Sequence, residues 1–351
     1  MAEPVPAALP WTMRILVLGG TGWLGGEVAR YALRQGHAVT CLARGSSGDV
    51  PSGVRLVRSD RTKPGAYAQV AREQIDVVID VSRQPGQVLS AVEALGAVSC
   101  YVFVSSSNVY ADLSTTGQDE DAPLLLPLEG DVMHSMDDYG PAKVACEQAV
   151  RDALGPDRSL IARVGLIGGP GDVFDRTGYW PWRFCRPGTR DGAVLVPDDP
   201  DLVTQVVDVR DLAAWLVESG TQSRSGVFNV TGEPWSLPEH LETARAVAGH
   251  TGPVVRVDPQ ELIARDVQPW MGERSLPLWL HDPAERGINA FDSTRARAVG
   301  LVSRPLRDTL RDTLAWELGR PSGLVRKAGL IDEDHRALLG ELQAAGQTSA
   351  T

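Results

Sequence analysis

Two side chains in the segment YGPAK could carry proton-transfer chemistry. Tyr139 and Lys143 are four positions apart, so on a helix they share one face. A phenol with an ordinary pKa of about 10 is a poor acid or base at neutral pH, and a neighbouring ammonium brings that pKa toward the working range. Proline is tolerated only in the first turn of a helix, so Pro141 predicts a helix that begins at or just before Tyr139. The pair predicts a tyrosine proton donor tuned by a lysine that can also hold the ribose of a nicotinamide.

The same spacing is common in solvated helical pairs. Lysine is scarce here, however, and the chain carries only Lys63, Lys143 and Lys327, so a lysine at this position favours a functional interpretation. Three serines, 105–107, follow the apolar run YVFV and are expected at the carboxyl edge of a sheet, where open α/β proteins bind ligands. A hydroxyl there could donate to a carbonyl oxygen that becomes negative as a hydride arrives. Each serine could equally serve a turn or a cap.

A glycine-rich turn precedes these groups. In RILVLGGTGWLGGEV, Gly19, Gly22 and Gly25 lie between an apolar strand and an amphipathic helix. One glycine allows the tight turn, one allows backbone to approach a pyrophosphate, and one allows the helix to pack on the strand. The helix start then offers N–H groups to the phosphates. We therefore predict a dinucleotide site that includes Gly19, Gly22, Trp23, Leu24 and Gly25.

The end of the second predicted strand favours NADP over NAD. NAD-binding proteins usually carry an acidic residue there, which accepts from the ribose 2′-hydroxyl. Here Ala43 occupies that position and Arg44 follows, which suits a 2′-phosphate, with Ser46 and Ser47 beside it. An exposed strand-end arginine is the plain alternative. Asp60, just past the third strand, could accept from the adenine amine.

The order of elements that must position these residues indicates a doubly wound α/β fold. Helices are expected at 23–35, 87–95, 139–154, 211–219 and 306–318, and strands at 14–18, 38–42, 54–57, 76–81, 100–104, 159–166, 206–209 and 226–230. Near-continuous apolar strands that alternate with helices are typical of a parallel sheet covered on both faces. The capping box from Ser236 to Glu239 opens one more helix.

The pattern changes after the second glycine-rich segment, GGPG at 168–171. We predict a dinucleotide-binding domain at 13–170 to which 203–231 returns, a smaller C-terminal substrate-binding lobe from 171–202 and 232–320, and a helical extension at 321–351. Residues 1–12, MAEPVPAALPWT, have no apolar run and read as a flexible tail rather than a signal peptide or membrane anchor.

Five segments, GGTGWLG, FVSSSNVYAD, YGPAK, RVGLIGGPGD and DVRDLAAWL, occur in this order, and together they resemble the extended short-chain dehydrogenase/reductase family of sugar-nucleotide epimerases, dehydratases and related reductases. The resemblance covers about residues 13–320, closely to 231 and loosely beyond. It implies a Rossmann domain, a small substrate lobe and commonly a homodimer formed through a helix bundle. The catalytic Ser, Tyr and Lys of the family correspond to Ser106, Tyr139 and Lys143.

Departures from the family pattern reduce the number of reactions that we expect. Family dehydratases follow the catalytic Thr with Asp and Glu, whereas this chain has Ser107 and Asn108, which disfavours dehydration and makes both residues candidate substrate contacts. The fourth strand reads VVIDVSRQPG where the family often has His or Asn. Arg44 argues against the tightly held NAD of epimerases. The segment LARG at 42–45 also resembles an NRG motif of atypical family members, some of which have lost catalysis. Here, however, Ser106, Tyr139 and Lys143 are all present.

Candidate substrate residues follow the sixth strand. Arg183 could clamp a phosphate or carboxylate and Trp180 could stack on a ring, although both could instead anchor the lobe. The formal net charge of -11 argues against a nucleic-acid or membrane partner. No run reaches the roughly 20 apolar residues of a membrane span. Cys41 and Cys100 lie in apolar strands without a CxxC pair, so we expect buried thiols, a cytoplasmic protein and no metal site.

The sequence thus predicts an NADPH-dependent reductase of a small or medium carbonyl substrate. Tyr139 would protonate the oxygen, Lys143 would tune Tyr139, and Ser106 would orient the carbonyl. Two alternatives stay open: an epimerase that oxidises and re-reduces one carbon with bound NAD, and a protein that binds NADP without catalysis.

Overall fold

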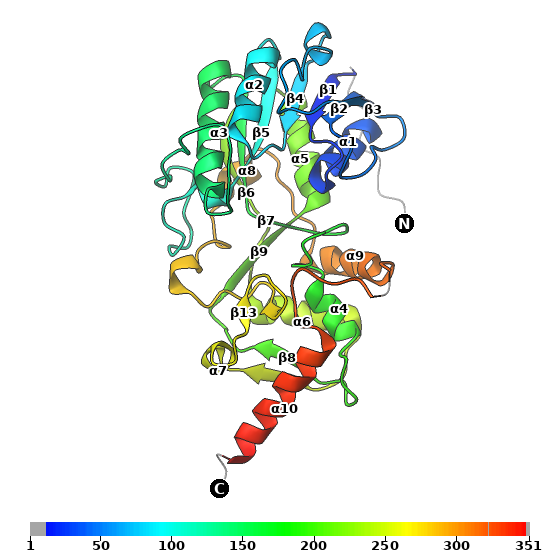
Figure 1. Ribbon diagram of the computed structural model, residues 1–351, viewed down its shortest axis with the longest axis vertical. Helices are drawn as coiled ribbons and strands as arrows, with labels where there is room; N and C mark the ends of the chain where they lie inside the picture. Colours follow the sequence, from blue (N-terminus) through cyan, green and yellow to red (C-terminus); the bar gives the residue numbers. More distant parts are fainter. Residues whose placement is uncertain (1–11, 322, 349–351) are drawn as a thin grey trace.

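The computed structural model describes residues 12–321 and 323–348, so the predicted tail lies outside the described residues except for Thr12. Seven parallel strands form the main sheet, in the upper part of Figure 1. Their spatial order is β10 (Gly226–Val230), β6 (Ser159–Val164), β5 (Cys100–Ser106), β4 (Val77–Asp80), β1 (Arg14–Leu18), β2 (Ala38–Ala43) and β3 (Arg55–Arg58). This arrangement confirms the predicted doubly wound parallel sheet.

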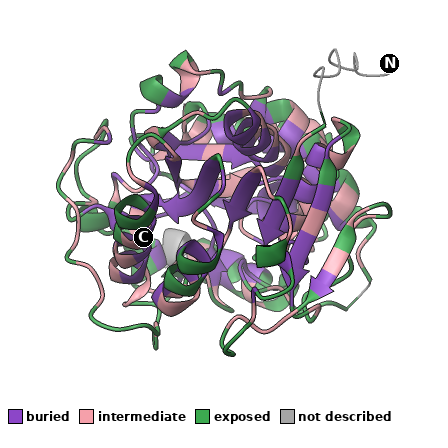
Figure 2. Cartoon of the chain, turned by 90° about the horizontal axis from the view of Figure 1, so that it is seen from above, coloured by how far each residue is buried: buried purple, intermediate pink, exposed green. Residues whose placement is uncertain are grey.

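Helices cover both faces of this sheet because its strands are apolar on both sides. Along β1, Ile15 and Val17 join the cluster under α1 (Trp23–Arg34) and α5 (Val209–Thr221). Leu16 and Leu18 point the other way and join the cluster under α2 (Pro85–Leu95) and α3 (Tyr139–Leu154). Figure 2 shows the resulting buried layer of strands. The expected core thiols Cys41 and Cys100 are buried in it.

The strand order reverses beside β1. The chain runs outward from β1 to β3, then returns to the other side of β1 to form β4. The turn after β1 and the loop after β4 therefore splay apart at the carboxyl edge of the sheet. This edge is where open α/β sheets bind their ligands.

A smaller lobe lies below the sheet in Figure 1. Its core joins helices, short strands and loops into one apolar cluster around Trp180 and Trp279. The helices are α4 (Tyr179–Cys185), α6 (Leu237–Ala248), α7 (Pro259–Ile263), α9 (Leu306–Leu318) and α10 (Asp332–Thr348), and the strand pairs are β8 (Val194–Pro197) with β12 (Val254–Val257) and β13 (Gln268–Pro269) with β14 (Ser275–Leu276). The extension carrying α10 docks on this lobe through an ion pair of Asp332 with Arg183.

A separate three-stranded sheet lies between the two parts. It consists of β7 (Leu166–Gly168), β9 (Val203–Asp208) and β11 (Pro234–Ser236). Of the segment 203–231, α5 and β10 lie in the main domain, and Val207 of β9 also joins the core of that domain. The short helix α8 (Thr294–Ala298) also returns to the main domain, where Ala296 is buried in the core beside β10. No helix among the described residues combines the length and apolarity that a membrane span requires.

Candidate active site

The glycine-rich turn between β1 and α1 exposes backbone rather than side chains. Gly19 has φ +95°, a conformation that favours glycine, and its carbonyl accepts from the N–H of Gly22 at 3.1 Å. A Cβ at Gly25 would collide with the carbonyl oxygen of Gly19, so α1 can pack this closely only with glycine there. Gly22 precedes α1 without a side-chain cap, which leaves first-turn N–H groups able to bind an anion.

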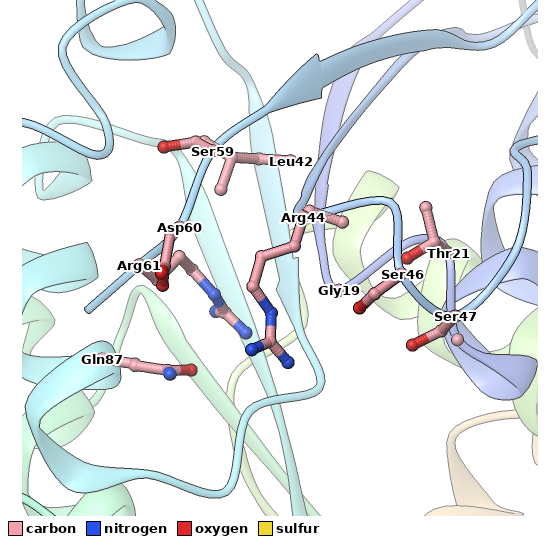
Figure 3. Close-up of a pocket in the computed structure, with 12 residues that line it drawn as sticks. Gly19, Thr21, Leu42, Arg44, Ser46, Ser47, Ser59, Asp60, Arg61 and Gln87 are labelled. Atoms are coloured by element: carbon pink, nitrogen blue, oxygen red, sulfur yellow. The ribbon is translucent and has the colours of Figure 1, made fainter. Parts of the chain in front are cut away.

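A pocket opens beside this turn, and Figure 3 shows its lining. It lies at the carboxyl edge of the sheet, where β1, β2 and β3 end. The lining residues come from the turn, from the segments after β2 and β3, and from α2: Gly19, Thr21, Gly22, Leu42, Ala43, Arg44, Ser46, Ser47, Ser59, Asp60, Arg61 and Gln87. Four of the predicted cofactor residues, Gly19, Gly22, Arg44 and Asp60, therefore share one pocket.

Two arginines point into the same space of this pocket (Figure 3). Arg44 is exposed at the end of β2 and makes no hydrogen bond or ion pair to any residue that the structure describes. Arg61, which is largely buried, pairs with Asp80 at 3.1 Å. Guanidinium groups match the planar oxygens of a phosphate, and Ala43 leaves no acidic acceptor at the end of β2. A phosphate-rich dinucleotide fits these donors.

Sequence reasoning did not find Arg61 or Asp80. The Asp80 carboxylate ends β4, is fully buried, and accepts from the Ser82 N–H at 2.9 Å and the Tyr101 hydroxyl at 2.8 Å. A buried carboxylate requires compensation, so Asp80 in an apolar strand was a signal for a nearby cation. The sequence could not identify Arg61 as that cation, because the two residues meet only through the pairing of the sheet.

Asp60 lies on the pocket wall and holds its own loop in place. Its carboxylate accepts from the backbone N–H of Thr62 at 3.0 Å and from the Thr62 hydroxyl at 2.8 Å. These hydrogen bonds lower the pKa of Asp60, with a smaller contribution from the charges of Lys63 and Arg44. Asp60 therefore stays an ionised acceptor that could receive a hydrogen bond from a ligand amine.

The side chains of Trp23 and Leu24 serve packing rather than the pocket. Trp23 donates its indole N–H to the carbonyl of Pro170 at 2.9 Å, which ties α1 to the second glycine-rich segment. Leu24 packs against the core under α1. Neither residue lines the pocket. Their predicted role in cofactor binding is thereby restricted to their backbone N–H groups at the helix start.

The helix that begins at Tyr139 carries the expected pair. Pro141 stands in its first turn, as predicted. Lys143 is buried and donates to the carbonyls of Ser82 at 2.6 Å and Val104 at 2.7 Å, at the ends of β4 and β5. Its Nζ lies 5.9 Å from the centroid of the Tyr139 ring. An ammonium has three donors, so one remains for a ligand hydroxyl, and the charge lies beside the phenol.

The three serines at 105–107 differ in their hydrogen-bond partners and in their surroundings. Ser105 donates to the buried Glu147 at 2.6 Å, and Glu147 also pairs with Arg163 at 2.9 Å. Ser106 accepts from the Asn108 N–H at 3.2 Å and donates to the Asn108 side-chain oxygen at 3.0 Å. Ser107 is buried in the short helix that follows β5, and Asn108 is half-buried. Ser105 therefore has a structural role, whereas the Ser106 hydroxyl is hydrogen-bonded only to Asn108, two positions further along the chain.

A glycine places this serine segment against the tyrosine helix. Gly140 follows Tyr139, and a Cβ there would collide with the carbonyl oxygen of Asn108. The first turn of α3 therefore packs directly on the segment that carries Ser106. Lys143 reaches the Val104 carbonyl of β5, and Tyr139 precedes the glycine that packs on the segment after Ser106. Gly140 was present in the YGPAK motif, but its contact partner could not be inferred from the sequence.

The predicted substrate residues of the lobe are not brought to this site. Trp180 is fully buried, and its indole N–H donates to the carbonyl of Pro277 at 2.7 Å. Arg183 is also fully buried and binds Asp332 at 2.7 Å together with the carbonyl of Leu330. Trp180 is thus held within the lobe core, and Arg183 anchors the lobe to its extension. The expectation that they contact substrate is therefore corrected.

No group of three or more His, Cys, Asp or Glu side chains within residues 12–321 and 323–348 is arranged to hold a metal ion. The donors at the edge of the sheet are instead guanidinium, ammonium, hydroxyl and backbone N–H groups. Such a set suits phosphates and hydroxyls.

Comparisons with known proteins point to one family. A sequence profile of the NAD dependent epimerase/dehydratase family matches residues 15–231. A 2'-dehydrokanamycin reductase from Streptomyces kanamyceticus is 35% identical over 161 residues, which cover 44% of this chain and 43% of that protein. A UDP-glucose 4-epimerase from Corynebacterium glutamicum is 24% identical over 295 residues, covering 72% of this chain and 87% of that protein.

A solved structure shares the fold across most of the chain. The UDP-N-acetylglucosamine 4-epimerase from Bacillus cereus superimposes with a TM-score of 0.65 at 15% identity, covering 90% of this chain and all of that one. The match to the reductase, by contrast, spans under half the length of either protein.

Proposed function

The chain belongs to the NAD dependent epimerase/dehydratase family, and on that premise we propose that it reduces a carbonyl group of a small or medium substrate with NADPH. The observation that carries the proposal is the buried Lys143 beside Tyr139, at the edge of the sheet that also bears Ser106. The 35% identity with a reductase over 161 residues supports net reduction.

Each residue of the site has a separate task in this reaction. When bound, the cofactor supplies the hydride that adds to the carbonyl carbon. Tyr139 donates its phenolic proton to the carbonyl oxygen, so that the product is an alcohol. Ser106 releases its hydrogen bond to Asn108 and donates to the same oxygen, where negative charge develops. Lys143 stabilises the phenolate that Tyr139 becomes and uses its remaining N–H on the cofactor ribose.

The choice of NADP rests on the arginines. Arg44 and Arg61 point into the pocket, Arg44 makes no hydrogen bond or ion pair to a described residue, and β2 ends without an acidic side chain. A charge-assisted hydrogen bond to a phosphate is worth about 1.5–3 kcal/mol, whereas NAD offers only a hydroxyl at this position. We infer that the cofactor exchanges freely, as net reduction requires.

A second candidate is epimerisation with bound NAD. It is favoured by the match to a UDP-glucose 4-epimerase over 87% of that protein's length. Arg44 in place of an acid counts against it. The Ser106, Tyr139 and Lys143 set counts against a protein that binds NADP without catalysis.

We also propose that the protein is a homodimer and that it is cytoplasmic. The resemblance implies a homodimer through a helix bundle, and Leu89 on α2 is an exposed apolar side chain on one helix that could contribute. The four cysteines are all unpaired, which suits the reducing cytoplasm. Light scattering after size-exclusion chromatography would separate a dimer of about twice the 37.7 kDa chain from a monomer.

The reaction can be tested on purified protein. We expect NADPH absorbance to fall on mixing with at least one member of a panel of ketones and keto-sugars, and NADH to support a much slower reaction. Stoichiometric NAD retained through purification, together with interconversion of nucleotide-sugar epimers and no net NADPH consumption, would replace reduction by epimerisation. A protein that binds NADPH and turns over neither panel would contradict both enzymatic proposals.

A further inference from the structure

The end of β4 carries a turn that one buried carboxylate holds in place. Oδ1 of Asp80 accepts from the backbone N–H of Ser82 at 2.9 Å and from the Ser82 hydroxyl. The other oxygen accepts from the hydroxyl of Tyr101 at 2.8 Å. All three residues are buried, so water does not compete for these hydrogen bonds. The position of the Ser82 carbonyl therefore depends on Asp80.

Arg61 supplies the positive charge that this carboxylate requires. Its Nη1 lies 3.1 Å from Oδ1 of Asp80 and also donates to the Ser82 hydroxyl. The side chain of Arg61 is 12% exposed and that of Asp80 is fully buried, so water and salt screen the pair little. Removing one partner of such a pair leaves the other charge buried and uncompensated. Arg61 thus holds the turn through both Asp80 and Ser82.

The same arginine faces the glycine-rich turn. It lines the pocket and points into it together with Arg44 (Figure 3). Its Nη2 lies 4.0 Å from the place that a Cβ of Gly19 would occupy, in the turn where we expect the pyrophosphate. A guanidinium has five N–H donors in one plane, so Arg61 can keep Asp80 on one side and bind a phosphate on the other.

Lys143 lies at the other end of these contacts. Its ammonium donates to the carbonyl of Ser82 at 2.6 Å and to that of Val104 at 2.7 Å. Charge-assisted hydrogen bonds are short and strong, so the ammonium follows the Ser82 carbonyl when that carbonyl moves. A continuous path of hydrogen bonds and one ion pair therefore joins the pocket to Lys143, through Arg61, Asp80 and Ser82.

We infer that Arg61 is a positioning residue that connects the phosphates of the cofactor to Lys143. When Arg61 binds a phosphate, its guanidinium is fixed, the turn at Asp80 and Ser82 is fixed with it, and the ammonium is held beside Tyr139. The inference rests on the proposed function, in which Lys143 stabilises the phenolate. It concerns the segment VVIDVSRQPG, where this chain departs from the family pattern.

The scarcity of lysine allows a test without turnover. Lys63, Lys143 and Lys327 are the only lysines of the chain, so lysine labelled with carbon-13 at Cε gives three resonances, assigned with Lys63→Arg and Lys327→Arg. The ligand is 2′-phospho-ADP, which carries the phosphates of NADP but lacks the nicotinamide ribose that would contact Lys143. We expect the saturating ligand to shift the Lys143 resonance and to leave that of Lys327, on the lobe, in place.

Variants along the path should change this shift in a defined order. In Arg61→Met the Lys143 shift should fall about threefold or more at a ligand concentration that calorimetry shows to be saturating, and Arg61→Lys should restore part of it. Ser82→Ala removes only a hydroxyl outside the pocket lining, so it should reduce the shift by about half and leave 2′-phospho-ADP affinity within about twofold. Arg55→Met, at an exposed arginine of β3, should keep the full shift.

Two results would overturn the inference: an unshifted Lys143 resonance in the ligand-bound wild type, or a full shift in ligand-bound Arg61→Met. Near-ultraviolet circular dichroism shows whether Arg61→Met is folded; if it is not, Ser82→Ala decides, and a full shift there overturns the inference.

Steady-state kinetics gives a second readout. Ser82→Ala should lower kcat about threefold with the KM for NADPH within about twofold, because the variant disturbs the position of Lys143 and not the pocket. A rise in KM alone would contradict the inference. Unchanged turnover in Tyr139→Phe would contradict the proposed function and leave the resonance shifts unaffected, so the two proposals fail separately.

Discussion

The sheet edge and the smaller lobe use polar side chains in opposite ways. At the edge, Lys143 on α3 and Arg44 after β2 each keep N–H donors without a partner among the described residues. In the lobe, Arg183 and Trp180 are fully buried. Arg183 donates to Asp332 and to backbone carbonyls, and Trp180 donates to a backbone carbonyl. A chemically suggestive residue therefore indicates a site only where the fold leaves its polar atoms unsatisfied.

The largest expected effect concerns Lys143, which belongs entirely to the sheet edge. Lys143→Met should lower turnover about 10²-fold or more, because the ammonium beside Tyr139 is lost. The variant also leaves the carbonyls of Ser82 and Val104 without a donor, which should cost about 1–3 kcal/mol of unfolding free energy. Steady-state kinetics and urea unfolding measure the two effects. Arg151→Met, an exposed change on the same helix, should alter neither; full activity in Lys143→Met would show that the lysine is structural.

Acid should weaken the lobe through two buried histidines. Burial lowers the pKa of His240 on α6 and of His335 on α10 to about 4, and His335 accepts from the Leu195 N–H at 3.0 Å. In the unfolded chain both titrate near an ordinary pKa of about 6.5. As the pH falls from about 6.5 to 4, the unfolded chain therefore binds protons that the fold does not, and each histidine costs up to about 3 kcal/mol of stability. Above pH 7 both histidines are neutral in the folded and the unfolded chain, so neither makes the stability depend on pH.

Urea unfolding at pH 7.5 and 5.0 measures this loss. His335→Gln keeps a side-chain acceptor without titrating and should reduce the pH dependence by about half. His134→Gln, on an exposed loop, should leave it unchanged. Equal stability at both pH values would contradict the neutral buried state of these histidines.

A variant at the sheet edge should also change the preference between NADP+ and NAD+, with a smaller effect than the loss of turnover in Lys143→Met. Arg44→Ser should weaken NADP+ binding about 10- to 100-fold, the equivalent of one charge-assisted hydrogen bond, and leave NAD+ affinity within about twofold. Calorimetric titration with each cofactor tests this. Equal weakening of both cofactors would place Arg44 on a group they share, such as the pyrophosphate.

The smallest effect is a helix cap in the lobe. Ser236 accepts from the Glu239 N–H, and the Glu239 carboxylate accepts from the Ser236 N–H at 3.1 Å, which completes the predicted capping box. Ser236→Ala should lower the unfolding free energy by about 1 kcal/mol without changing turnover. Urea unfolding at pH 7.5 and steady-state assays test it. A loss of activity with unchanged stability would mean that this end of the lobe is coupled to the sheet edge.

Local sequence signals were sufficient for the main domain. Helix α3 runs from Tyr139 to Leu154 as predicted, because an amphipathic pattern, Pro141 and a terminal glycine define it locally. Asp208 caps α5 by accepting from the Arg210 N–H at 2.9 Å. The glycine turn and Arg44 meet in one pocket because parallel strands end at the same edge. Local periodicity and strand ends determine all of these features.

Features that depend on distant pairing could not be predicted. Asp80 pairs with Arg61 across the sheet, and Arg176 lies against Trp270, which is 94 positions away in the sequence. Trp180 and Arg183 have the residue types of a ligand site, and only their burial shows that they belong to the lobe core. The pairing of β9 with β7 and β11 also escaped prediction, because short strands of a mixed sheet carry little pattern.

The central claim is that Tyr139 protonates a carbonyl at the edge of the main sheet. The most direct measurement compares wild type and Tyr139→Phe for NADPH oxidation with a carbonyl substrate that the wild type accepts, alongside the affinity of each for NADP+. The account predicts a fall in turnover of about 10²- to 10⁴-fold with NADP+ affinity within about twofold, because only the hydroxyl is removed. Turnover within fivefold of wild type would contradict it.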